Sequence, residues 1–484
     1  MKSYALISLA ILLALIVGVI HAQDELCPAG LPERPALSRH IEQEDILSGK
    51  LGFDELLAHG EELFSVLFNV CDGQGRPATT GGVAAREADE IAFSRVSAPD
   101  SNSCFSCHNQ PRVGGGAEFV GNVFLLAQHA DPVLETTAMM SSNHRNPLGM
   151  FGAGPIEMLA LEMTRDLQAL REAARSKARD QGDSVTVALV SKGVSFGELT
   201  MAADGAQDSS GIEGVDHDLV IKPFHQSGTK ISLRQFSANA MNQHHGMQAE
   251  ERFDLNPEIM DADFDRDGVQ RELTIGDITA VTLFQAALGT PGRLLPAQPE
   301  RHQDAIRGEA LFDQIGCTTC HVPELRLESR FFSDPNPFNP SNTLTDMSQT
   351  VRFDMTEQGQ EPRLERDGAG AILRAFTDLK RHSLCDPADQ PNAIRFFCNE
   401  TLRDSRPDVN GRHGSEFFIT RKLWDVGSSA PYGHRGDLTT VSEAILMHGG
   451  EARAARDAFT ELPFADQRAV VEFLLSLQVL PALE

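Results

Sequence analysis

The sequence predicts a mainly α-helical protein with two similar units and a small β insertion in the first. Three observations support this: two Cys-x-x-Cys-His motifs, a Gly-Glu-x-Leu-Phe helix pattern ahead of each, and apolar residues at helical spacing between them. A chain of 484 residues is long enough for two or three domains. We expect an N-terminal domain over residues 23–290 and a C-terminal domain over residues 300–484, with a boundary in the Pro/Gly-rich stretch 289–303.

The helix pattern occurs in "HGEELFSVLF" (residues 59–68) and in "RGEALFDQIG" (residues 307–316). Further helices are predicted by the apolar spacing over residues 159–174, 275–288 and 464–480. Gly289 is a plausible C-cap for the second of these helices.

β-Rich residues predict a hairpin in the first domain. The runs 185–190 and 194–201 flank Lys192-Gly193, a pair suited to a turn. Residues 218–224, "DLVIKPF", are a candidate third strand.

The first 22 residues have the layout of a secretory signal peptide. One Lys precedes an apolar run, and His21-Ala22 and a polar, acidic stretch follow it, so we expect cleavage near Ala22 and a periplasmic or secreted protein. An uncleaved membrane anchor is the alternative. The formal charge of -27 argues against nucleic acid and anionic membranes as partners. It suits a generally acidic soluble surface, or one that docks a basic partner.

Four cysteines lie outside the two motifs: Cys27, Cys71, Cys385 and Cys398. In an oxidising compartment they would form two disulfides, for which three pairings exist. Proximity in sequence favours Cys385 with Cys398, which leaves Cys27 with Cys71. Buried free thiols are the alternative.

Each Cys-x-x-Cys-His motif supplies the groups that a c-type haem needs. Two thiols meet the two vinyl groups on one porphyrin edge, and the imidazole reaches the iron from the same side. The thioether sites would be Cys104, Cys107, Cys317 and Cys320, and the proximal ligands His108 and His321. A zinc site or a redox disulfide would not explain a His directly after both second cysteines. Two haems on one chain imply electron transfer between them, and the sixth ligand of each iron decides whether that iron is catalytic.

Four segments carry a family resemblance: "CFSCHNQPRVGGGAEFVGNVF", "FGAGPIEMLALEMT", "NQHHGMQAEERFD" and "LWDVGSSAPYGHRGDLTTVSEAILMHGGEA". They resemble the bacterial di-haem oxidoreductases, peroxidase-like proteins related to di-haem cytochrome c peroxidase and MauG. The resemblance covers roughly Gly60 to the C-terminus. It implies two cytochrome c-like haem domains and an enzyme in which electrons pass from the C-terminal haem to an N-terminal haem that reduces peroxide. It also implies a small redox donor protein, such as a cytochrome or cupredoxin.

Three other functions stay open. One is a pure electron-transfer di-haem cytochrome with no catalytic site. Another is a MauG-like oxidase of a protein or organic substrate, and the last is a haem-based redox sensor.

The resemblance also implies residue roles around the C-terminal haem. Its sixth ligand falls about fourteen residues after the histidine of "PYGHRG", His434, which gives His448, with Met447 as the alternative. Relatives usually carry a Met there, so His448 would make a bis-imidazole haem of lower potential. Trp424 would relay electrons between the haems, or else simply pack beside a porphyrin. Tyr432 is the only other readily oxidised aromatic of the mature chain.

Around the N-terminal haem, the resemblance implies Glu157 as the acid–base carboxylate that promotes peroxide cleavage. The alternative is a glutamate that satisfies backbone donors near a helix start. His129 occupies the region where relatives carry a displaceable ligand, although a surface histidine is the simpler interpretation. The motif "QHHGMQ" (residues 243–248) offers two histidines and a methionine to a haem, without indicating which one binds.

Two further features are candidates for binding. "DADFDRDGVQRELT" resembles a calcium loop because Asp263, Asp265 and Asp267 alternate before Gly268. The terminal Glu of such loops is missing, since Thr274 stands there and Glu272 comes two positions early, so a solvated acidic turn is the alternative. Arg112 follows the first motif and would pair with a haem propionate or be an exposed loop residue.

Overall fold

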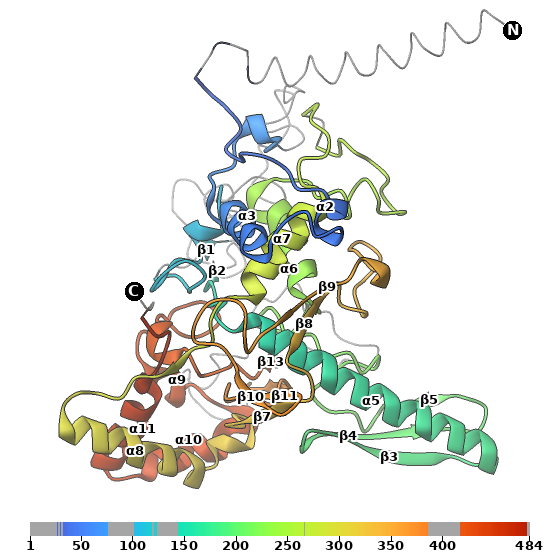
Figure 1. Ribbon diagram of the computed structural model, residues 1–484. Coiled ribbons are helices and arrows are strands. Elements are labelled where there is room, and N and C mark those ends of the chain that lie inside the picture. Colours follow the sequence, from blue (N-terminus) through green and yellow to red (C-terminus); the bar gives the residue numbers. More distant parts are fainter. Residues whose placement is uncertain are drawn as a thin grey trace, which may run out of the picture.

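A computed structural model describes residues 27, 30, 32–75, 101–118, 121–122, 144–265, 267–385 and 417–481. Over these residues the protein is a mainly helical chain with small two- and three-stranded sheets (Figure 1). The prediction of a mainly α protein is confirmed to that extent. The division into two cytochrome c-like domains stays a prediction, and the predicted signal peptide (1–22) lies outside the described residues.

The described helices are α2 (Gln43–Leu47), α3 (Phe53–Ser65), α5 (Ala153–Gln181), α6 (Leu233–His245), α7 (Ile275–Ala286), α8 (Pro299–Gln314), α9 (Val441–Leu446), α10 (Arg453–Glu461) and α11 (Phe464–Ser476). All five predicted helical stretches fall within or overlap α3, α5, α7, α8 and α11, so these predictions are confirmed. The predicted C-cap is wrong, because α7 ends at Ala286 and its C-cap residue is Ala287, two residues before Gly289.

The described strands are β1 (Gly121–Asn122), β2 (His144–Arg145), β3 (Val185–Ser191), β4 (Val194–Met201), β5 (Gln207–Asp208), β6 (Gly292–Arg293), β7 (Leu325–Leu327), β8 (Phe331–Asp334), β9 (Val351–Asp354), β10 (Glu365–Asp367), β11 (Gly370–Leu373), β12 (Arg381–Ser383), β13 (Phe417–Ile419) and β14 (Leu477–Gln478). The antiparallel β3–β4 pair confirms the predicted hairpin. The C-terminal half also contains small sheets that the sequence analysis did not predict: β10–β11–β7, β8–β9 and β12–β13.

The prediction of a third strand over residues 218–224 is wrong. The strand that joins β4 is β5, in register Thr200 with Asp208. Leu219 has a φ of +58°, which an extended strand does not accommodate. The backbone N–H of Ile221 donates to Thr164 Oγ1 of α5 at 3.0 Å, so this segment packs on the helix instead of the sheet.

Helix α5 is a long arm that carries the β3–β4 hairpin along one side (Figure 1). It begins after Gly152 and ends at Gly182, and both glycines adopt left-handed backbone conformations that other residues rarely adopt. Its buried stripe recurs at helical spacing and includes Leu159, Met163, Leu167 and Ala174. This stripe belongs to the same apolar cluster as the buried hairpin residues Leu189 and Phe196.

Two apolar clusters form the described core. The larger one joins helices of the N-terminal half to residues of β7, β8, β9 and β11 and to Trp424. The smaller one lies around α8 and α11 and includes Phe312, Phe376 and Phe473. Gly308 lets α8 approach α11 closely, since a Cβ there would lie 1.9 Å from the Ala469 carbonyl oxygen. β6, just before α8, pairs with β14 at the end of the described chain.

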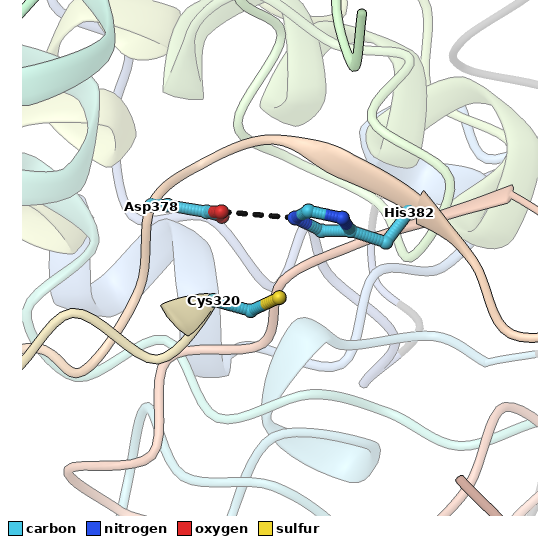
Figure 2. A group of neighbouring side chains, drawn as sticks. All are labelled: Cys320, Asp378 and His382. Atoms are coloured by element: carbon cyan, nitrogen blue, oxygen red, sulfur yellow. Dashed lines mark hydrogen bonds and ion pairs between the residues drawn. The ribbon is translucent and has the colours of Figure 1, made fainter. Parts of the chain in front are cut away.

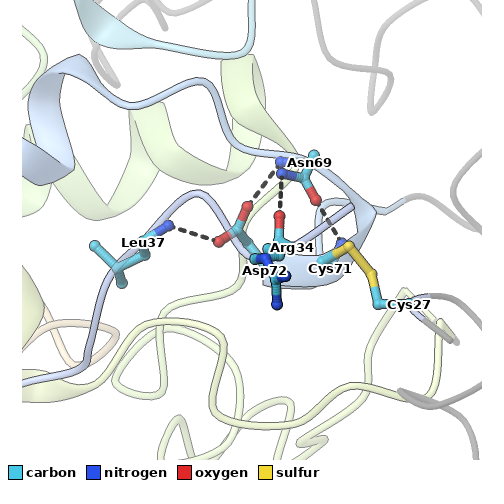
Figure 3. The surroundings of a disulfide bond; sticks show 6 residues. All are labelled: Cys27, Arg34, Leu37, Asn69, Cys71 and Asp72. Carbon is cyan, nitrogen blue, oxygen red and sulfur yellow. Dashed lines mark hydrogen bonds between the residues drawn. A yellow bond between two sulfur atoms is a disulfide. The ribbon is translucent and has the colours of Figure 1, made fainter. Parts of the chain in front are cut away.

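Cys27 and Cys71 form a disulfide, which confirms that predicted pairing (Figure 3). Next to it, Asn69 caps a 3-10 turn (Val70–Asp72), and Asp72 accepts from the N–H groups of Asn69 and Leu37. Cys385 is also disulfide-bonded. Its predicted partner, Cys398, lies outside the described residues. No helix in the described part of the chain combines the length and the apolar character needed to cross a bilayer.

Candidate functional site

The first Cys-x-x-Cys-His motif forms one tight turn that contacts the C-terminal end of α3. Cys104–Ser106 is a 3-10 turn, and the backbone N–H of His108 donates to the Cys104 carbonyl at 2.9 Å. Ser103 is fully buried, and its hydroxyl is within 3.2 Å of the carbonyl oxygens of Phe64 and Ser65 at the end of α3. The turn therefore gathers both thiols and the imidazole, as a haem attachment site requires.

His108 is oriented by backbone carbonyls. Its Nδ1 lies 3.0 Å from Leu148 O and 3.3 Å from Gly115 O, and because a carbonyl only accepts, Nδ1 carries the proton. Nε2 is then unprotonated and suited to bind a metal. Burial lowers the pKa of His108 to about 4, which keeps the ring neutral.

The second motif repeats this arrangement. Cys317–Thr319 is a 3-10 turn, and the N–H of His321 donates to the Cys317 carbonyl at 3.0 Å. His321 Nδ1 donates to Phe376 O at 3.1 Å. Burial, and then the nearby His448, lower the pKa of His321 to about 4. In the described part of the chain none of the four motif cysteines forms a disulfide, which leaves their sulfur atoms for haem attachment.

His448 faces His321. Their ring centres are 6.5 Å apart, and His448 Nδ1 donates to Ala444 O at 2.7 Å, which leaves its Nε2 available. An imidazole nitrogen lies about 2 Å from its metal, so two rings on opposite sides of one iron have centres about 6 Å apart. The separation of the two ring centres therefore matches the one expected if both rings bound one haem iron. Met447 instead packs against Phe418.

The "QHHGMQ" motif lies beside the first haem motif. His245 Nε2 is 3.2 Å from Cys104 Sγ, and its Nδ1 donates to Ser101 O at 2.8 Å. His244 is near enough for its charge to lower the pKa of His108, after the larger effect of burial. Met247 is fully buried in the main core. His129 lies outside the described residues.

Trp424 lies between the segments that hold the two proximal histidines. Its ring packs on Gly152, four residues after Leu148, whose carbonyl binds His108. On the other side, the N–H of Leu423 donates to Ala375 O at 2.9 Å, next to Phe376, whose carbonyl binds His321. Trp424 is only 3% exposed. Tyr432 instead donates its hydroxyl to Val426 O at 2.9 Å.

Several polar groups near Trp424 lack partners among the described residues. They are Trp424 Nε1 and the Nε and Nη2 groups of Arg112, all buried. Arg112 is half-buried over the ring of Phe151, at 4.5 Å, and its Nη1 donates to Gln360 Oε1. Buried donors need acceptors, and haem propionates would supply carboxylate oxygens here.

Glu157 lies in the second turn of α5 and is 3% exposed. One carboxyl oxygen accepts from the N–H of Leu233 at 2.8 Å, and the other accepts from Asn336 Nδ2 at 2.9 Å. Burial raises the pKa of Glu157 to about 8 despite these two bonds, so the side chain holds a proton at neutral pH.

The acidic loop brings its carboxylates together. Oxygens of Asp263, Asp265 and Asp267 all lie within 4.8 Å of one another. Glu272 is buried beside them, and burial and the charges of Asp265 and Asp267 raise its pKa well above the usual value. Burial and then Asp265 raise the pKa of Asp267 to about 7, and its Oδ2 has no partner in the described part of the chain. Gly75 lies against this oxygen, 3.0 Å from the position of a Cβ.

The sequence analysis missed one group beside the second motif. Asp378 and His382 lie next to Cys320, with acceptor and donor atoms all within 4.8 Å (Figure 2). His382 also bonds Glu451. The i, i+4 spacing of Asp378 and His382 was visible in the sequence, but nothing there links them to Cys320 or to Glu451.

The two motifs, with a second histidine opposite His321, define a protein suited to carry two haems on one chain. A protein-family model described as "Di-haem oxidoreductase, putative peroxidase" matches residues 394–477. This match confirms the resemblance seen in the sequence and identifies the chain as an oxidoreductase.

Two solved structures are also similar. One is hydrazine synthase of Kuenenia stuttgartiensis under xenon pressure, at 13% identity over 93% of this chain and 97% of that one, with a TM-score of 0.37. The other is a MauG-like protein associated with microbial copper homeostasis, at 15% identity over 58% and 78%, with a TM-score of 0.28. Likenesses with such low TM-scores support no conclusion about fold or activity. No curated protein sequence matches the chain.

Proposed function

We propose that this protein is an exported di-haem c-type oxidoreductase that reduces peroxide. One observation supports the proposal above all. The ring centres of His321 and His448 are 6.5 Å apart, and His321 directly follows a Cys-x-x-Cys turn in a chain that has a second such motif. When bound, the haems supply the redox chemistry, with external electrons taken up at the C-terminal haem and peroxide reduced to water at the N-terminal one.

The protein positions each haem through its thiols and a neutral imidazole. Cys104 and Cys107 would form the thioethers of the first site, and Cys317 and Cys320 those of the second. Their histidines have Nδ1 bonded to backbone carbonyls, which fixes the ring orientation and leaves Nε2 for the iron. His448 would close the C-terminal site, which suits electron transfer more than catalysis.

Trp424 is proposed to link the two sites. It is buried, it is the only tryptophan, and it contacts Gly152 close to the His108 segment while Leu423 is bonded to the His321 segment. Lys422 Nζ lies 5.8 Å from the centre of the Trp424 ring and donates to Gly149 O at 3.0 Å. Lys422 Nζ also lies 3.3 Å from Asp425 Oδ2, so its positive charge beside the indole is partly balanced.

Glu157 is proposed as the proton-holding residue for peroxide cleavage. Its raised pKa, about 8, makes it a proton donor at neutral pH, as general acid catalysis requires. Its bonds to Leu233 and Asn336 keep the carboxyl group in one position.

The test is peroxide consumption by the haem-loaded protein with a reduced donor. We expect turnover by the native protein and a loss of roughly 100-fold or more in Glu157→Gln, the lower end of the effect of removing an acid–base group. Glu162→Gln is the matched control, because Glu162 is also buried on α5 and bonds the N–H groups of Glu328 and Ser329. We expect it to keep the native rate.

Three outcomes would contradict all or part of this proposal. Two irons that stay low-spin after one-electron reduction, with no peroxide turnover, would indicate a pure electron-transfer cytochrome. Equal rates in Glu157→Gln and Glu162→Gln would reduce Glu157 to a structural role. Oxidation of an added protein or organic substrate at the expense of peroxide would indicate a MauG-like oxidase.

Export and the donor are part of the same proposal. The Cys27–Cys71 disulfide supports an oxidising compartment, and the N-terminal 22 residues have the pattern of a signal peptide. The formal charge of -27 favours a donor with a basic face, such as a small cytochrome or cupredoxin.

We also propose that the acidic loop binds calcium. Three carboxylates there, Asp265, Asp267 and Glu272, are almost completely buried close to one another, and such an arrangement is costly without a cation. Calcium takes carboxylate and carbonyl oxygens, and Glu272 replaces the glutamate missing from the end of the loop. Gln248 bonds both Asp265 and Glu272 and stands three residues after His245, which contacts Cys104.

Calcium is therefore expected to stabilise the chelator-treated protein. At a concentration 100 times the Kd the gain is about 2.7 kcal/mol, measured by thermal denaturation with and without calcium. Asp267→Asn is expected to lose most of this gain, while Glu258→Gln, an exposed acid three residues before the loop, keeps it. An equal gain in both variants, or none in the native protein, would rule out this site.

A further inference from the structure

His382 is bonded to a carboxylate on each side. Its Nε2 lies 2.9 Å from Asp378 Oδ2, and its Nδ1 lies 2.7 Å from Glu451 Oε2. Because carboxylates accept hydrogen bonds, both ring nitrogens carry protons and the ring is positively charged. Burial alone would lower the pKa of His382, but the hydrogen bonds to Asp378, Cys320 and Glu451 outweigh it and raise the pKa to about 11.

Asp378, on one side of the His382 ring, is linked to the segment that holds His321. Phe376 O accepts from His321 Nδ1 at 3.1 Å, and the N–H of Thr377 donates to Val322 O at 3.0 Å. Asp378 is the next residue and is 2% exposed. Asp378 is thus fixed to the segment that positions the proximal histidine.

Glu451, on the other side of the His382 ring, belongs to the loop that follows His448. Glu451 stands three residues after His448, and its Oε1 accepts from the N–H of Ser383 at 2.8 Å. Gly450 approaches the same strand so closely that a Cβ would lie 2.3 Å from Ser383 O. Glu451 therefore joins the loop after His448 to β12, the strand that carries His382.

The same three side chains do not suit a metal ion. Figure 2 shows Cys320, Asp378 and His382 around one point, a combination that often binds metals. Both nitrogens of His382 are already protonated and bonded to carboxylates, so neither offers a lone pair. Cys320 is one of the proposed thioether sites. The arrangement instead resembles a bridge between two segments.

We propose that His382, held between Asp378 and Glu451, is a positioning residue that ties the His448 loop to the His321 segment and keeps His448 in its axial position. The inference rests on the proposed haem between His321 and His448. It adds a reason why His448, which comes from a separate segment of the chain, stays in place. Charge-assisted hydrogen bonds on both sides of one ring are suited to this task.

The test measures how readily His448 leaves the iron. Carbon monoxide binds reduced haem iron only at an open axial position, so its binding rate at the C-terminal haem reports opening. The kinetic phase of that haem is identified as the one that becomes fast in His448→Ala. We expect the phase to be slow in the native protein and about tenfold or more faster in His382→Gln, which loses a charged bridge. Glu451→Ala, which removes only the half-exposed end of the bridge, should show a smaller acceleration.

A matched control is His59→Gln. His59 is also buried and bonds a carboxylate, Asp277 Oδ1 at 2.9 Å, but it lies on α3 in the N-terminal half. We expect it to leave the C-terminal phase unchanged.

The outcomes separate this inference from the proposed function. Fast binding at both haems of the native protein would overturn the His321–His448 site itself. A slow native phase that stays equally slow in folded His382→Gln would overturn the bridge alone. If His382→Gln does not fold, the same comparison is made with Glu451→Ala, and a native rate in that variant overturns the bridge.

Discussion

Replacement of His448 by alanine is expected to convert one of the two haem irons from a low-spin state with two strong ligands to an open, high-spin state. The reason is that the imidazole whose ring centre lies 6.5 Å from that of His321 is then gone. Loss of a strong axial ligand should also raise the potential of that haem by on the order of 100 mV, part of the ~0.8 V range that axial ligands span. Electron paramagnetic resonance and a redox titration measure both effects.

Met447→Ala is the control for this prediction. Met447 is adjacent in sequence and packs against Phe418. It should leave the spin state and the potential unchanged. The reverse result, with ligation lost in Met447→Ala and kept in His448→Ala, would assign the sixth ligand to Met447.

Gly152→Ala is expected to lower the free energy of unfolding by about 3 kcal/mol. Gly152 has a φ of +70°, and a side chain in that conformation costs roughly 1–2 kcal/mol. A Cβ there would also lie 2.1 Å from Trp424 Cζ2, and such overpacking adds about 1–3 kcal/mol. Chemical denaturation of the haem-loaded protein measures the sum. Displacement of Trp424 should also slow electron exchange between the two haems.

Gly182→Ala isolates the conformational part of this effect, so the difference between the two variants gives the steric part. Gly182 ends the same helix with a φ of +66°, and no atom lies within 4 Å of its Cβ position. It should cost only the conformational term, about 1–2 kcal/mol. If the two variants are equally stable, the packing of Trp424 on Gly152 does not contribute to stability.

Much of the fold could be predicted where the signal is local. The periodic stripe of α5 and the turn at Lys192-Gly193 each lie within one short stretch, and both predictions are confirmed. The strand expected over residues 218–224 failed because its partner is a helix, through Thr164, and composition does not reveal a partner. The small sheets of the C-terminal half were missed because each pairs only a few residues, and β7–β11, β8–β9 and β12–β13 join segments well separated in the chain.

The candidate haem sites show the same contrast between features that a short motif predicts and features that depend on the fold. Cys-x-x-Cys-His carries its whole chemistry in five residues, so sequence alone indicates it. The pairing of Asp378, His382 and Glu451 joins residues far apart in the chain, which no single motif contains. The role of Glu272 was obscured by spacing, since its position beside Asp265 and Asp267 depends on how the loop folds back.

The burial of the motif thiols affects how readily a haem can be attached to them. Cys104 is half-buried beside His245, and burial raises the pKa of its thiol to about 12, so little of it is thiolate at neutral pH. Cys317 is in the same condition, with a pKa of about 12. A half-buried, protonated thiol is a poor nucleophile. If the haem is attached through these thiols, we expect attachment to be faster on a partly unfolded chain than on the folded one.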